Sequence, residues 1–202
     1  MAISLTKGQK INLEKDSGEK LSQICLGLNW GVIEKKGFFS TSKESVDLDG
    51  SCAMFNKDKK LLEVIYFGNL QSKNRSIIHS GDDLSGDSDG DDGTDNEIIS
   101  VDLQNIGSDV EQIVFILNSF QGHDFSKIPF ARIRIFEGNF SKVENVVATY
   151  DISKDSKFEG FVSMVMGKLY KRGEEWKFSA IGEPTTDSKL KESLATVKAK
   201  YL

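Results

Sequence analysis

The stretch Gln23-Ile-Cys-Leu-Gly-Leu-Asn-Trp30 sets the pattern that most of the chain follows. Apolar residues occupy every second position from Ile24 to Trp30, and this period of two predicts a strand with one buried face. Comparable runs recur at 61–67, 97–103, 112–117, 130–136 and 146–152. Regularly spaced strands of this kind predict a mainly β protein, an antiparallel β-sandwich.

The C-terminal part of the chain changes from strand to helix. Runs at 161–170 and 175–181 flank Lys171-Arg-Gly-Glu174, which predicts a hairpin with Gly at the turn. After Pro184, apolar residues fall at helical spacing from Leu190 to Tyr201, with Thr186 or Asp187 placed to cap the start. We therefore expect a single domain over residues 1–202, with one C-terminal helix packed on the sheets.

Composition limits the classes of partner. The net charge is -5 and no run of Lys and Arg exceeds a pair, so a nucleic-acid-binding surface is not expected. The chain has no run of eighteen apolar residues, and we expect a cytoplasmic location. Cys25 and Cys52 lie in apolar runs without metal-ligand spacing, and we expect buried, unreactive thiols.

The most unusual segment is the acidic loop between two strand candidates. Seven Asp and one Glu lie between Asp82 and Glu97, with no Lys or Arg among them. Carboxylates crowded in this way either take up protons or recruit a cation. Carboxylate, hydroxyl, amide and backbone oxygens suit calcium, and glycines let the chain curl around an ion. A solvated acidic surface loop is the alternative, and the spacing does not match an EF-hand because Asp92 and Ile98 occupy its sixth and twelfth positions.

A second acidic segment, Val46-Asp-Leu-Asp-Gly-Ser-Cys-Ala-Met-Phe55, reads as a strand. Asp47 and Asp49 would share one of its faces, roughly 6.5 to 7 Å apart along the strand. Two neighbouring carboxylates can face one ion or bridge two. The alternative is that Asp47 and Asp49 bind no ion and simply lie on an ordinary polar outer face of this strand.

These segments together resemble the TerD family of tellurium-resistance and stress proteins. The likeness rests on Ser80-Gly-Asp-Asp-Leu-Ser-Gly-Asp-Ser-Asp-Gly-Asp-Asp92, on Asp47-Leu-Asp-Gly-Ser-Cys52 and on shorter matches along the chain. The resemblance implies a β-sandwich that binds calcium, commonly at two neighbouring sites. It also implies ligands at the matching positions Asp47, Asp49, Asp82, Asp83, Asp89, Asp91 and Asp92.

One departure from the family pattern leaves the later ligand open. Glu directly follows the Asp pair in the family pattern, whereas Gly93-Thr-Asp-Asn precedes Glu97 here. Asp95, Asn96 and Glu97 are therefore alternatives. The full set of candidate ligands for two calcium ions is Asp47, Asp49, Asp82, Asp83, Asp87, Asp89, Asp91, Asp92, Asp95 and Glu97.

The leading functional hypothesis is a non-enzymatic calcium-binding module of a bacterial stress response, including resistance to tellurite, that acts through protein partners in a complex. One alternative is a metal-dependent phosphoesterase in which these carboxylates hold two Mg²⁺ ions, but the segment contains no base and no Lys or Arg to bind a phosphate. The other is attachment to acidic lipids that requires calcium. Membrane contact is otherwise expected to be indirect.

Overall fold

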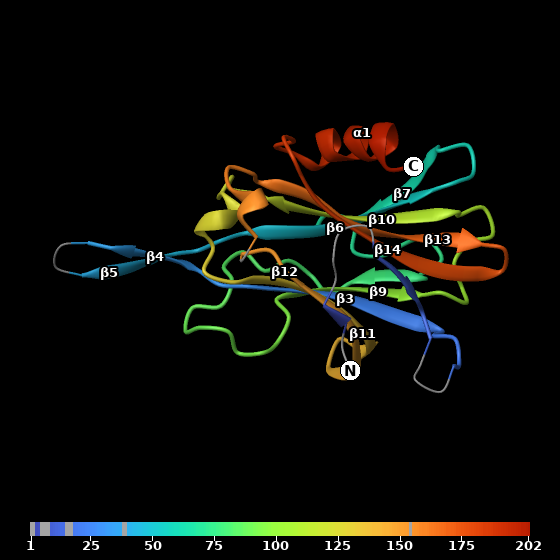
Figure 1. The fold of residues 1–202 in the computed structure, drawn as a ribbon, viewed down its shortest axis with the longest axis horizontal. Helices are drawn as coiled ribbons and strands as arrows, with labels where there is room; N and C mark the ends of the chain where they lie inside the picture. Colours follow the sequence, from blue (N-terminus) through green and yellow to red (C-terminus); the bar gives the residue numbers. More distant parts are fainter. Residues whose placement is uncertain (1–2, 5–8, 15–17, 38–39, 154) are drawn as a thin grey trace.

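Two β-sheets pack face to face (Figure 1). The computed structural model describes residues 3–4, 9–14, 18–37, 40–153 and 155–202, and these residues form two six-stranded sheets and a two-stranded hairpin. The first sheet has the order β1 (Ile3–Ser4), β12 (Lys142–Asp151), β11 (Ala131–Asn139), β3 (Gln23–Trp30), β9 (Glu97–Asp102) and β8 (Ile77–His79). The second has the order β2 (Lys10–Asn12), β14 (Glu175–Thr185), β13 (Ser163–Arg172), β10 (Gln112–Ser119), β6 (Leu48–Phe55) and β7 (Leu61–Ile65). The predicted antiparallel sandwich is confirmed, and β1 adds one parallel pairing to β12.

The main core lies between the two sheets. Leu26, Leu28 and Trp30 of β3 join Phe115 and Leu117 of β10 in one buried cluster. Large apolar side chains projecting from both inner faces provide most of the burial that stabilises a sandwich.

The prediction that β3 has only one buried face is wrong. Cys25, Gly27 and Asn29, on the opposite face, are also buried. Cys25 packs with Ile98 and Phe136 in a separate apolar cluster. Other parts of the chain cover this face, and a short-range pattern of polarity cannot reveal such cover.

The C-terminal helix α1 (Leu190–Lys200) covers the outer face of the second sheet (Figure 1). Val197 is fully buried in a cluster with Phe55 and Val165. The helix is confirmed, but its predicted cap is wrong. Lys189 occupies the N-cap position and makes no side-chain capping bond. Instead, Glu192 accepts hydrogen bonds from the backbone N–H and the hydroxyl of Ser188.

Several strand boundaries extend beyond those expected from sequence. The predicted hairpin is present, and Gly173 at its turn has φ +64°. Strand β14 continues through Pro184 to Thr185. Pro184 pairs with Met164 of β13, whereas β2 contacts β14 only at 177–179, so the missing N–H of proline interrupts no ladder there.

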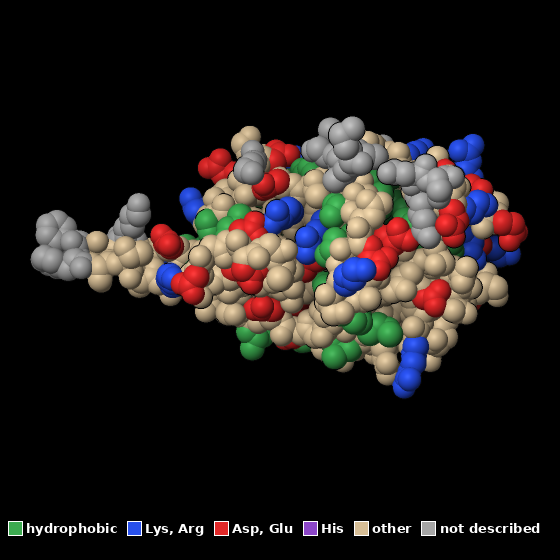
Figure 2. Space-filling model, turned by 90° about the horizontal axis from the view of Figure 1, so that it is seen from below, with side chains coloured by type: hydrophobic (Ala, Val, Ile, Leu, Met, Phe, Trp, Pro, Cys, Tyr) green, Lys and Arg blue, Asp and Glu red, His purple; other side chains and the backbone are tan. Residues whose placement is uncertain are grey.

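The remaining elements are short. A hairpin of β4 (Ile33–Lys36) and β5 (Thr41–Glu44) projects from one end of the sandwich (Figures 1 and 2). Two 3₁₀ turns, η1 (Phe125–Lys127) and η2 (Ser156–Phe158), place Phe125 and Phe158 in the core. Both cysteines are buried and free, as predicted, and burial raises the pKa of each thiol.

Within the described parts of the chain, α1 is the longest helix, and no helix has the length and apolar character needed to cross a membrane.

The packing of α1 predicts a stability effect. Val197→Ala should lower the free energy of unfolding by about 1–3 kcal/mol, because it removes buried methyl groups from the cluster beneath the helix. Lys198→Ala, at the next, exposed position, is the control and should change it by less than about 0.5 kcal/mol. Guanidinium chloride unfolding measures both. Equal effects would show that α1 does not pack as described.

Candidate metal centre

The acidic loop, residues 80–96, is fixed to the end of β3 by backbone hydrogen bonds. Asp87 N–H donates to Trp30 O over 2.9 Å, and Val32 N–H donates to Asp87 O over 3.1 Å. Val46 N–H donates to Ser85 O over 2.9 Å. The loop, green in Figure 1, therefore lies folded at the same end of the sandwich as the β4–β5 hairpin. It is an ordered element instead of a free acidic tail.

Trp30 joins the middle and the last residue of this loop to the core. Its backbone N–H donates to Asn96 Oδ1 over 2.8 Å, and its indole Nε1–H donates to Val46 O over 2.7 Å. Gly86 packs against the indole so closely that an added Cβ would lie 2.6 Å from Cδ1. Gly86 also has φ +74°, which favours glycine.

Asp83 organises the first half of the loop. Its Oδ1 accepts hydrogen bonds from the backbone N–H groups of Ser85 and Gly86, and its Oδ2 accepts one from the side chain of Asn96. Burial opposes ionisation of Asp83, but these donors together hold its pKa below the usual range. Both side-chain atoms of Asn96 that can hydrogen-bond are used inside the protein, because Asn96 Nδ2 also donates to Asp87 Oδ1 over 3.0 Å.

Basic side chains reach the loop from other elements. Lys43 forms an ion pair with Asp89, Arg132 with Asp91 and Arg134 with Asp95. The view that no Lys or Arg offsets the loop is therefore correct for residues 82–97 alone and wrong for the folded protein. On the face seen in Figure 2, acidic and basic side chains are mixed over this end of the molecule.

Asp95 lies directly over β3. Its carboxylate is 1% exposed, and Arg134 Nε lies 2.8 Å from its Oδ1. A Cβ at Gly27 would lie 2.1 Å from Asp95 Oδ2, so only glycine leaves room for this carboxylate. The pair occupies the outer face of β3 that sequence reasoning expected to be free.

Glu97 is fully buried beside His79. Its Oε2 accepts the Gly50 backbone N–H over 2.8 Å and lies 3.4 Å from His79 Nε2. His79 Nδ1 accepts the Gly81 N–H over 3.1 Å, so Nε2 carries the ring proton. Burial lowers the pKa of His79, but the hydrogen bond and charge of Glu97, with smaller contributions from Gly50 and Asp82, together shift it upward. Glu97 thus ties β9 to β6 and to the start of the loop.

Asp47, Asp49 and Asp82 form the carboxylate triad. Each offers an oxygen, and these three oxygens all lie within 4.8 Å of one another. Asp49 is on β6, Asp47 directly precedes it, and Asp82 comes from the acidic loop. Asp47 and Asp49 are 4% and 8% exposed, whereas Asp82 is exposed. Among the residues that the structure describes, the triad is the one group of three such ligands close enough to share an ion.

The triad carries unbalanced negative charge. Burial, followed by the charges of Asp82 and Glu97, raises the pKa of Asp47 to about 6. Burial, followed by the charges of Asp47 and Glu97, raises the pKa of Asp49 to about 7. Asp47 Oδ1 is buried and makes no hydrogen bond with any described residue. A buried oxygen of this kind is costly unless a proton or a cation satisfies it.

The other candidate ligands are not members of this group of three oxygens. Asp87 Oδ2 accepts the Asp92 N–H over 3.3 Å, and Asp92 Oδ1 accepts hydrogen bonds from Thr94 that lower its pKa. Of the ten candidate ligands named from the sequence, the structure brings Asp47, Asp49 and Asp82 together. Sequence reasoning missed Arg132 and Arg134, although their alternation in Ala131-Arg-Ile-Arg-Ile135 places both on one face of a strand.

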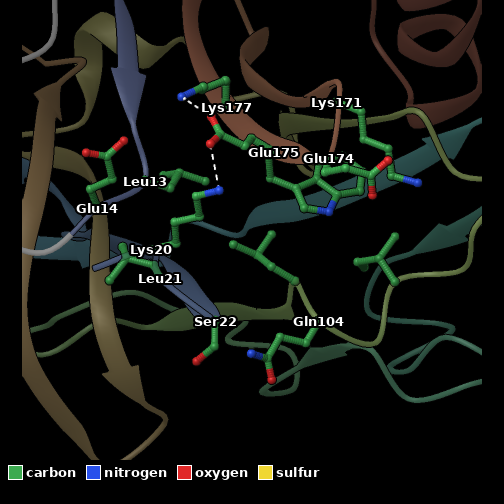
Figure 3. Close-up of a pocket in the computed structure, with 13 residues that line it drawn as sticks. Leu13, Glu14, Lys20, Leu21, Ser22, Gln104, Lys171, Glu174, Glu175 and Lys177 are labelled. Atoms are coloured by element: carbon green, nitrogen blue, oxygen red, sulfur yellow. Dashed lines mark ion pairs between the residues drawn. The ribbon is translucent and has the colours of Figure 1, made fainter. Parts of the chain in front are cut away.

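A pocket of about 550 Å³ lies at the opposite end of the sandwich, around the β13–β14 turn (Figure 3). Its charged groups pair with one another, since Lys20 and Lys177 both contact Glu175, at 2.6 and 2.9 Å. Lys171 lies 5.3 Å from the ring centre of Trp176. These groups balance one another, unlike those of the triad.

The fold and the site define a β-sandwich protein with an ordered acidic loop and a carboxylate triad at one end. The family model for the TerD domain matches residues 1–196. The chain belongs to the TerD family.

Named relatives match along most of this chain. The stress response protein SCP2 of Bacillus subtilis is 36% identical over 96% of this chain and 98% of its own length. The tellurium resistance protein TerZ of Serratia marcescens is 32% identical over 89% of each chain. A solved homologue of the telluride resistance protein TerD from Streptomyces coelicolor matches with a TM-score of 0.65 and 13% identity, covering 84% of this chain and 94% of that one. This structural likeness concerns the fold.

The contact between Gly86 and Trp30 predicts a mutational effect. Gly86→Ala should destabilise the protein by about 2–4 kcal/mol, because the methyl group meets the indole and the backbone has positive φ. Gly93→Ala is the matched control, with φ +81° and nothing within 4 Å of an added Cβ, and should lose only about 1–2 kcal/mol. Chemical unfolding measures both. Equal losses would contradict close packing of the loop on Trp30.

The triad predicts a pH dependence in the presence of a chelator. Asp47 and Asp49 bind protons more tightly in the folded state, with pKa values of about 6 and about 7 against 3.8. Their contribution to stability is therefore complete at low pH and is lost as pH rises through about 7. Asp49→Asn should flatten the fall in melting temperature between about pH 5 and about pH 7.5. Asp58→Asn, in the exposed β6–β7 turn, is the control and should leave the fall in melting temperature as it is in the wild-type protein. A slope unchanged by Asp49→Asn would refute this assignment.

Proposed function

We propose that this protein binds calcium at the carboxylate triad and acts, without catalysing a reaction, in bacterial stress resistance. The observation that carries the proposal is the triad itself, in which Asp47 offers an oxygen within 4.8 Å of Asp49 and Asp82 and has a buried Oδ1 without a partner among the described residues. A divalent cation would satisfy this oxygen and balance the repulsion that raises the pKa values of Asp47 and Asp49.

The spacing of the triad suits calcium. Calcium binds oxygens at about 2.3–2.6 Å, so two oxygens on opposite sides of one ion are separated by up to about 5 Å. The three oxygens lie within 4.8 Å of one another and so fall within this limit. Calcium takes about six to eight oxygens, so water and backbone carbonyls would complete its coordination. The donor set contains no thiolate, and His79 is occupied with Gly50, Gly81 and Glu97, which disfavours zinc.

Calcium would connect two parts of the structure. Asp49 belongs to β6 in the core of the second sheet, whereas Asp82 belongs to the loop that lies on the first. An ion held by both would therefore stabilise the loop and the junction of the two sheets. Binding to the folded state alone would raise stability by mass action.

The second calcium ion expected from sequence remains part of the proposal. Its candidate ligands are the remaining acidic residues of the loop, above all Asp83, Asp87, Asp89, Asp91 and Asp92. Asp89 and Asp91 have basic partners, so an ion there would have to compete with Lys43 and Arg132. We therefore expect the triad to fill first.

The stress role follows from the named relatives, which are stress response and tellurium resistance proteins. We propose that the calcium-loaded protein acts there through protein partners. A phosphoesterase is less favoured, although basic side chains do approach the loop, because each is held by an acidic partner. Within the described chain, these pairs leave no free Lys or Arg side chain on the loop itself to hold a phosphate there.

Calcium titration by calorimetry tests the proposal. The wild-type protein should take up calcium and, at about 100 times the Kd, gain about 2.7 kcal/mol of stability. Asp82→Asn should weaken binding at least about tenfold, because it removes one charged ligand of the triad while changing only an exposed side chain. Asp58→Asn is the control and should bind as the wild type does. Absence of calcium uptake by the wild-type protein, or full uptake by Asp82→Asn, would overturn the triad as the site.

A further inference from the structure

A second pocket, of about 480 Å³, opens beside the triad. It lies between the start of β6, the end of β7, the end of β10 and the start of α1, and Asp49 lines both the pocket and the triad. The volume is that of a small-molecule site. An ion held by Asp49 would therefore border a space large enough for an organic ligand.

One wall of this pocket is aromatic. Phe67 and Phe120 meet edge to face with ring centres 5.9 Å apart, and Tyr66 packs on Phe67 at 5.2 Å. Phe120 is 66% exposed and Phe67 is 38% exposed. Rings that face solvent beside a pocket offer a flat apolar surface to a ligand.

The floor of the pocket contains polar atoms that lack partners. Ser51, Asn118 and Ser119 line it and are 1%, 5% and 1% exposed. Ser51 Oγ, Asn118 Oδ1 and Ser119 Oγ each make no hydrogen bond with a described residue. Buried polar atoms are normally satisfied, so this group indicates a ligand or water that bonds to them.

The remaining wall favours negative charge. Lys189 and Lys191 line the pocket at the start of α1, and no side chain of the N-cap residue satisfies the helix N-terminus. Glu192 is the acidic residue in this first turn, and its carboxylate is bonded to Ser188. The positive end of the helix and two lysines therefore face the same space.

From these observations we infer that the pocket binds a small organic anion with an aromatic or similarly flat apolar body. Its carboxylate or phosphate oxygens contact the calcium ion and the start of α1, and its ring lies against Phe67 and Phe120. This inference rests on the proposed calcium site, because without the cation Asp49 would repel the anion.

Three probes, each with one aromatic ring, separate the contribution of the negative charge from that of the ring. Phenyl phosphate carries a phosphate and 3-phenylpropionate a carboxylate, and 3-phenylpropanol is the neutral counterpart. Titrations of the full chain, followed by NMR of the backbone amides of Phe67, Phe120 and Leu190, report binding in the pocket. In the presence of calcium, at least one anion should bind about tenfold more tightly than the alcohol. Removing the calcium with a chelator should weaken the binding of that anion by about the same factor. The tighter of the two anions identifies the preferred group.

Matched phenylalanine variants locate the site. Phe120→Ala should weaken binding of the preferred anion by about fivefold to tenfold, because it removes one aromatic face and leaves the core intact. Phe140→Ala, in the turn between β11 and β12, is the control, since Phe140 is 44% exposed and lies outside the pocket. Calcium uptake should be the same in both variants.

The outcomes separate this inference from the calcium proposal. Calcium uptake without binding of either anion would overturn the pocket ligand and leave the ion site standing. Equal binding of anion and alcohol, or equal binding with and without calcium, would overturn the ion-bridged mode. Calcium-dependent sedimentation with phosphatidylserine vesicles that Phe120→Ala abolishes, without binding of the small anions, would assign the surface to membranes instead.

Discussion

Two carboxylates, Asp47 and Asp49, are buried at the point where the second sheet meets the acidic loop. Burial removes most of their contact with water, and Asp82 and Glu97 add like charge. The fold can relieve this repulsion by protonation, as the raised pKa values of both groups indicate, or by a cation. The proposed ion site follows from this local conflict of charge, at the point where β6 and the loop bring the three carboxylates together.

The acidic residues of the loop, and Glu97 directly after it, differ in the partners that hold their carboxylates. Asp89, Asp91 and Asp95 have basic partners from other elements, and Asp83 is held by backbone N–H donors. Glu97 is joined to His79 and Gly50. These contacts give the loop a fixed shape, whereas Asp82, which receives no such contact within the described chain, reaches toward Asp47 and Asp49. The structure thus separates carboxylates that build the loop from carboxylates that are free to bind an ion.

The sequence predicted features that depend on short-range pattern. Alternation in Gln23–Trp30 identified β3 and the core, and the spacing of Asp47 and Asp49 identified two carboxylates able to act together. It could not predict that Asp95 covers Gly27 or that Lys43 and Arg132 reach the loop, because those contacts join residues far apart in the chain. The prediction of the helix cap was wrong for a local reason. The Glu192 carboxylate accepts a hydrogen bond from the Ser188 backbone N–H, and neither Thr186 nor Asp187 caps the helix.

A crystal structure of the calcium-loaded protein, with the ion located by its anomalous scattering, would show whether calcium binds at the triad. We expect an ion bound by oxygens of Asp47, Asp49 and Asp82 at about 2.3–2.6 Å, with Asp47 Oδ1 among its ligands or bonded to a water that the ion holds. Calcium bound elsewhere on the loop, with the triad lacking an ion, would contradict this expectation.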